Sequence, residues 1–205
     1  MALAPLALPA VIDRIAVSVG NRVVTTSDID REIRVTAFQN GVKPDFSPAN
    51  KRTTADRMVE QTLIRREMEI SRYPVPGVAE IEGDLADTRK HYRDDADFQR
   101  ALAEYGITEQ DLKDELLWQR TVVLFTDVRF RPGVQVSDQD IQDYFDKVEA
   151  PAARAAHPGR PVALEDFRSK IEATLAGQRV DQQVDIWLRE ARNRTEIVYH
   201  PEALQ

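Results

Sequence analysis

Alternating apolar positions open the chain and predict a short hairpin. Residues 15, 17 and 19 of Ile15–Val19 are apolar, and smaller or polar residues separate them, which is the period-two pattern of a strand with one buried face. Gly20-Asn21 is typical of a two-residue hairpin turn, and residues 23–25 return as a second strand. Ser27 follows as the expected N-cap of a first helix, with Asp28 in its first turn.

A hairpin of this size is not stable alone in water and needs a further strand and a helical layer. Residues 195–199 (TEIVY), at the far end of the chain, supply the expected strand. We therefore predict a mainly α protein: a helical bundle with a small antiparallel β-sheet formed by the N-terminal hairpin and the C-terminal strand.

Capping residues, glycines and prolines divide the rest of the chain into helices. Asn40-Gly41 is a predicted left-handed helix end, Ser47-Pro48 a helix start, and Gly106 a second end. Thr108 and Ser137 each stand three residues before an Asp, which resembles a capping box. The predicted helices span about 27–39, 47–73, 78–92, a short segment capped by Asp97, a long segment after 108, a segment after 137, and 164–192.

The helix after Thr108 carries apolar residues on nearly every side. One stripe contains Trp118, Val122 and Phe125, and two others contain leucines and valines. Such a helix is either central to a bundle, here held by the closing helix through Trp187 and Leu188, or presents a face to a partner. Both interpretations stay open, and the second makes this stripe part of an apolar peptide-binding groove.

Three further residues complete the candidate peptide-binding set: Met58, Phe98 and Tyr105. With three methionines in the whole chain, a methionine-rich adaptable surface is not expected, so Met58 is favoured as a core residue.

Four blocks, in order, resemble the periplasmic SurA-type chaperones. They are residues 15–29 (IAVSVGNRVVTTSDI), 106–112 (GITEQDL), 136–145 (VSDQDIQDYF) and the helical segment 167–192. In that family the third block precedes a parvulin prolyl isomerase domain and the fourth follows it. The resemblance implies an exported protein that binds unfolded outer-membrane or secreted proteins without ATP.

The chain departs from the family where the isomerase would lie. Residues 149–161 (EAPAARAAHPGRP) are rich in Pro, Ala and Gly, which is typical of a linker. The chain has no Cys, and its three histidines, His91, His157 and His200, are scattered. We therefore expect no prolyl isomerase and no other enzyme activity.

Composition narrows the partners. The net charge of −7 and pI near 5.1 disfavour nucleic acid, and no stretch has the length of a transmembrane helix. The sequence lacks the phosphate-binding glycine loop and the G-x-S-x-G and H-E-x-x-H motifs. Acidic runs such as Glu67 with Glu69, or residues 94–97, are expected to be solvated helix faces. No metal or other cofactor is expected.

We thus predict an ATP-independent periplasmic chaperone for unfolded or extended polypeptides, with a homodimer compatible with the sequence. Its expected parts are 1–11 (a signal remnant or disordered lead), 12–148 (the chaperone domain), 149–161 (a linker) and 162–205 (a helix and strand completing the same domain). The alternative is an assembly factor with one fixed partner. A fragment of a longer isomerase is disfavoured, because the closing helix and strand are present.

Overall fold

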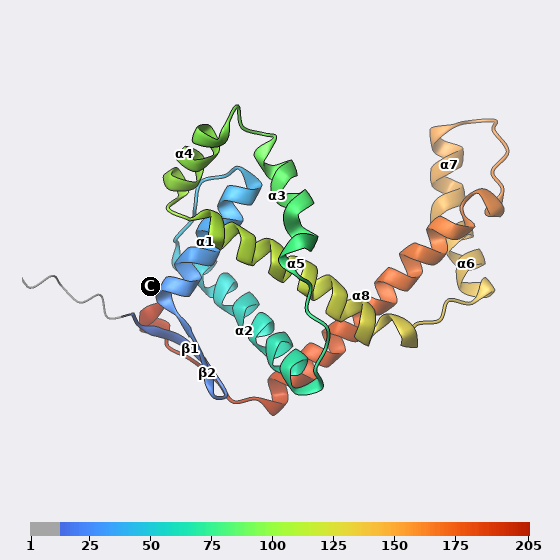
Figure 1. Cartoon of the computed structure of the whole chain (residues 1–205). Helices are drawn as coiled ribbons and strands as arrows, with labels where there is room; N and C mark the ends of the chain where they lie inside the picture. Colours follow the sequence, from blue (N-terminus) through green and yellow to red (C-terminus); the bar gives the residue numbers. More distant parts are fainter. Residues whose placement is uncertain (1–12) are drawn as a thin grey trace, which may run out of the picture.

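The computed structural model describes residues 13–205, and these form a mainly α protein with one small antiparallel sheet (Figure 1), as predicted. The expected lead, 1–11, lies outside the described residues. The strands are β1 (Ile15–Val19), β2 (Arg22–Thr25) and β3 (Ile197–Tyr199). The α-helices are α1 (Thr26–Asn40), α2 (Pro48–Ser71), α3 (Glu82–Arg89), α4 (Asp95–Tyr105), α5 (Glu109–Arg129), α6 (Asp138–Tyr144), α7 (Ala150–Ala156) and α8 (Arg168–Arg194). Shorter helices are η1 (Val78–Ile81), η2 (Arg131–Gly133), η3 (Phe145–Glu149, a π-helix), η4 (Leu164–Asp166) and η5 (Pro201–Ala203).

The sheet joins the two ends of the chain in the order β2-β1-β3. Val19 pairs with Arg22 across the turn and with Ile197 on the other side. Gly20 has a φ of 59°, whereas the φ of Asn21 is not positive. A type I′ turn needs a positive φ at both central residues, so this turn is instead of the kind that needs glycine at its first central position. The predicted hairpin and its C-terminal strand are confirmed.

Two predicted helix caps are wrong by two or three residues. Thr25, not Ser27, caps α1, because its hydroxyl accepts from the Asp28 backbone N–H at 3.3 Å and the Asp28 carboxylate accepts from the Thr25 N–H at 3.0 Å. The Ser27 side chain instead contacts Asp13. Asp94, not Asp97, caps α4. The predicted caps at Ser47, Thr108 and Ser137 and the left-handed ends at Gly41 and Gly106 are confirmed.

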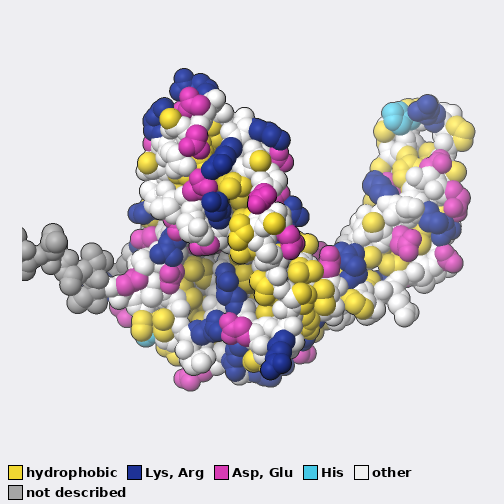
Figure 2. Space-filling model, viewed as in Figure 1, with side chains coloured by type: hydrophobic (Ala, Val, Ile, Leu, Met, Phe, Trp, Pro, Cys, Tyr) yellow, Lys and Arg dark blue, Asp and Glu magenta, His cyan; other side chains and the backbone are white. Residues whose placement is uncertain are grey.

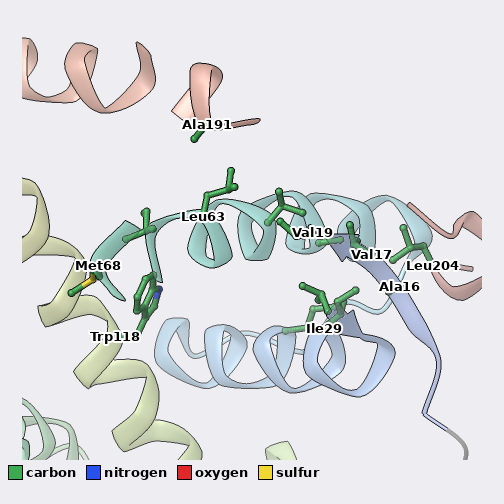
Figure 3. Close-up of a cluster of buried hydrophobic side chains, with 14 of the residues drawn as sticks. Ala16, Val17, Val19, Ile29, Leu63, Met68, Trp118, Ala191 and Leu204 are labelled. Carbon is green, nitrogen blue, oxygen red and sulfur yellow. The ribbon is translucent and has the colours of Figure 1, made fainter. Parts of the chain in front are cut away.

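Two apolar clusters fill the body of the molecule. The first joins the sheet to α1, α2, α5 and α8, and Figure 3 shows Ile29 of α1 lying across from the strand residues Val17 and Val19. The second joins the C-terminal half of α1 to η1, α3, α4 and the first half of α5. Because α5 contributes to both clusters, it is apolar nearly all round, and the interpretation of α5 as a central helix is confirmed.

A separate arm projects from the body on the first half of α8 (Figure 1). It consists of α6, η3, α7 and η4 packed on α8 around their own apolar cluster, which includes Ile141, Phe145 and Ile171. The prediction that 149–161 is a linker is therefore wrong for Ala150–Ala156. Alanine is the strongest helix former, and Pro151 occupies the first turn of α7, where proline is tolerated. Ala150 is also buried in the arm cluster, so this segment contributes to a core.

Candidate functional site

A hollow of about 650 Å³ lies between α1, α2, α5 and α8. We call it the body groove. Its floor is apolar, and polar side chains of α1, α2 and α5 line it as well. Val123 on the α5 side is 57% exposed, so apolar surface in the groove is open to solvent. The apolar lining residues are Ile64, Trp118, Val122, Val123, Val184 and Leu188.

The structure brings together only part of the predicted peptide-binding set. Trp118 and Val122 line the body groove as predicted, and Met58 lines a neighbouring hollow of about 170 Å³ that Trp118 also borders. The predicted stripe therefore contributes two of its three residues to the groove.

The prediction that Phe125 and Phe98 belong to a peptide-binding surface is wrong, because both side chains are buried. Phe125 is 1% exposed and packs edge-on against Trp187 at 5.6 Å and Tyr73 at 5.3 Å, which fixes α5 against α8 and the end of α2. Phe98 is fully buried in the second cluster, and the half-buried Tyr105 packs on Phe38 there, away from the groove. Each aromatic ring is covered because the helix that carries it has apolar neighbours on that side.

Sequence reasoning missed the wall of the groove that α8 provides. Val184 and Leu188 lie one turn apart on α8 and face Val122 and Val123 across the groove. Their four-residue spacing is the available signal, but the same spacing also continues the buried stripe of Val180 and Trp187. The sequence analysis also does not identify Ile64 of α2 as a residue that lines the groove.

Polar contacts hold the four helices of the groove in place. Arg192 of α8 donates to the Glu60 carboxylate at 3.1 Å and to the Asp56 backbone carbonyl at 2.9 Å, both on α2. Arg57 of α2 binds Glu32 of α1 at 3.2 Å. On the other wall, Gln119 of α5 donates to Gln39 of α1 at 3.2 Å. These contacts join α8 to α2, α2 to α1 and α5 to α1 around the groove.

Glu115 is the electrostatically unusual residue of the groove. Burial, and then the negative charge of Glu32, raise the pKa of Glu115 from its ordinary value of 4.5 to about 7. Its carboxylate accepts one hydrogen bond, from Gln119 Nε2 at 2.9 Å. The guanidinium of Arg65 lies 3.9 Å above the Trp118 ring, and burial lowers the pKa of Arg65. Burial therefore disfavours the charged forms of both Glu115 and Arg65 at this end of the groove.

A second hollow, of about 390 Å³, lies on the other side of Trp118 between α2, α5 and the loop that carries Val75. Figure 2 shows hydrophobic side chains gathered on the body next to the point where α8 leaves it, with the arm standing away from them. Ile70, Val75 and Val78 are all more than half exposed in this part of the chain. Figure 3 shows Trp118 beside Met68, with its ring between α5 and α2. Trp118 thus borders hollows on two sides.

The chemistry available at these hollows is non-covalent. Within residues 13–205, no group of three or more His, Cys, Asp or Glu side chains is placed to hold a metal ion. His91, His157 and His200 lie on three separate parts of the chain: after α3, at the tip of the arm and after β3. Among the same residues, no helix combines the length and apolar character needed to cross a membrane.

Neither a protein-family model nor a curated protein sequence matches this chain.

Proposed function

We propose that the protein is an ATP-independent chaperone that binds extended, partly apolar segments of unfolded proteins in the body groove. The observation that carries this proposal is the open groove with an apolar floor, set between four helices that their own contacts hold in place. A volume of about 650 Å³ is within the range of ligand-binding clefts and suits a few side chains of an extended segment.

The expected affinity follows from this size. Burying one large aliphatic or aromatic side chain contributes about 1.5–3 kcal/mol, and ordering a flexible client offsets part of that gain. Two or three such side chains contribute at most about 9 kcal/mol before that cost is subtracted, so binding is no tighter than micromolar and release is fast. Release at this affinity needs no nucleotide.

The periplasm as compartment, and unfolded outer-membrane or secreted proteins as clients, rest on the sequence resemblance to SurA-type chaperones. Residues 149–161, which include α7 of the arm, lie where the resemblance would put the isomerase of that family, and we propose that the protein does not catalyse prolyl isomerisation. A prolyl test peptide should isomerise in its presence as slowly as it does without catalyst, over tens to hundreds of seconds.

A pair of double variants tests the groove. Val123→Gln with Val184→Gln places two polar side chains in the groove, whereas Val128→Gln with Ile186→Gln changes exposed residues of the same two helices outside it. Val123, Val128 and Ile186 are 57%, 43% and 42% exposed, and Val184 is half-buried, so both pairs should fold. We expect the groove pair alone to lose binding to an unfolded porin and to lose suppression of its aggregation, by about tenfold or more.

Equal behaviour of the two pairs would contradict this location of the site. If the wild-type protein suppresses no aggregation and instead recovers one folded partner, the assembly-factor alternative replaces the chaperone proposal.

A further inference from the structure

Two carboxylates, from different helices, border the body groove at the same end. Glu32 of α1 and Glu115 of α5 both line it, and both also line the smaller hollow beside Met58. They are close enough for the charge of Glu32 to act on Glu115. The apolar floor formed by Trp118 and Val122 begins directly beside them.

Only one cation forms an ion pair with this carboxylate pair within the described chain. Arg57 binds Glu32 at 3.2 Å and also contacts Thr36, while Gln61 donates to the same Glu32 oxygen at 3.3 Å. Glu115 receives a hydrogen bond from Gln119 and has no ion pair with any residue of 13–205. Arg65, the other nearby cation, lies over the ring of Trp118. One negative charge is therefore left without a direct partner at the edge of an apolar groove.

The other titratable and charged groups around Glu115 do not supply that partner. Those that line the hollows with Glu115 are Asp28, Arg31 and Glu32 from α1, Arg57, Glu60 and Arg65 from α2, and Asp111 and Asp114 from α5. Arg31 pairs with Asp28 and Asp111, and Glu60 pairs with Arg192 of α8. Acids outnumber the cations at this end of the groove, so its field favours a positive ligand group.

We propose that the body groove selects client segments in which a lysine or arginine adjoins apolar residues, with the cationic group bound between Glu32 and Glu115. The proposal rests on the proposed function and specifies its substrate class. A lysine or arginine side chain suits this edge because its methylene stem covers apolar surface while its charged end reaches a carboxylate. Charge complementarity thus adds to the apolar contacts that Val122, Val184 and Leu188 offer.

Proton linkage gives the proposal a distinctive signature. A bound cation favours the ionised form of Glu115, whereas a purely apolar ligand favours its neutral form. Because the pKa of Glu115 is about 7, this residue ionises between mildly acidic and mildly basic pH. Affinity for a basic segment should therefore rise across that interval, and affinity for the matched neutral segment should fall or stay level.

The experiment uses two fluorescein-labelled peptides of alternating Val and Phe that differ at one central position, Lys in one and norleucine in the other. Anisotropy titrations at about pH 6 and about pH 8 should show the Lys peptide binding about tenfold more tightly at the higher pH. Glu115→Gln should abolish the preference for the Lys peptide over the norleucine peptide at about pH 8. Glu104→Gln, which changes an exposed acid of α4 outside the groove, should keep that preference. Glu32→Gln serves as a second test of the same carboxylate pair.

Equal affinity of the two peptides for the wild-type protein, or a lysine preference that survives both Glu115→Gln and Glu32→Gln, would overturn the inference and leave the proposed function standing. Failure of both peptides to bind would overturn the proposed function, and this inference with it.

Discussion

Replacing Glu115 by Gln should raise the free energy of unfolding, and this gain in stability should increase with pH. Glu115 has a pKa of about 7 in the folded chain against an ordinary value of 4.5, so the folded state holds its proton more tightly than the unfolded state does. Between these two values the wild-type protein loses stability as the pH rises, and above about 7 the loss is complete. Glutamine does not titrate, and its side-chain oxygen still accepts from Gln119.

The magnitude follows from the size of the shift. At about 1.4 kcal/mol per pH unit, the interval from 4.5 to about 7 corresponds to roughly 3.5 kcal/mol as an upper limit. Glu115 is only partly buried, and solvent screening reduces the effect. We expect Glu115→Gln to unfold at a free energy about 1–2 kcal/mol higher than wild type at about pH 8, and at nearly the same free energy at about pH 5.

Urea unfolding of both proteins, followed by far-UV circular dichroism, measures this difference at each pH. Asp87→Asn is the control, because a hydrogen bond from Lys90 lowers the pKa of this exposed carboxylate and its loss should give no gain at the higher pH. A gap that is the same at both pH values, or a variant less stable than wild type at about pH 8, would refute the reasoning.

Three further predictions concern the fold. Phe125→Ala should cost about 3–5 kcal/mol in urea unfolding, since its ring fills the contact between α5 and Trp187; a cost no larger than that of Val128→Ala would contradict this packing. Deleting 195–205 removes β3 together with the buried Ala203 and Leu204, and should lower the thermal midpoint of the whole protein, whereas an unchanged midpoint would sink the three-stranded sheet. Cleavage at a specific protease site inserted after Gly159, between α7 and η4, should leave the two pieces co-eluting, because α8 stays packed on α2; separation of the pieces would show that this connection holds the fold.

Local signals were sufficient to predict much of the fold. The positive φ of Gly20, Gly41 and Gly106, and the capping boxes at Thr108 and Ser137, are each encoded within a few residues. The predicted α1 cap is wrong because Thr25 and Ser27 are both suitable cap residues, and the contacts of Ser27 with Asp13 decide between them.

The arm and the groove depend on contacts between distant parts of the chain. Residues 150–156 appear linker-like by composition, yet they fold because Ala150 has a core to join. On α5, Phe125 and Val123 are both apolar, and contacts with distant residues, Trp187 of α8 and Tyr73 after α2, bury the first while the second stays exposed. The raised pKa of Glu115 depends likewise on burial between α1 and α5, and no spacing within the sequence indicates it.

Site-specific crosslinking tests the central claim most directly. A benzophenone side chain placed at Val123 points from α5 into the body groove, and the same side chain at Val128 lies on that helix outside the groove. Irradiation with an unfolded outer-membrane protein should give crosslinks from position 123 that an excess of unlabelled apolar peptide removes, and few from position 128. Crosslinks of equal yield at both positions, or none at position 123 while the client is bound, would contradict the assignment of the groove as the client-binding site.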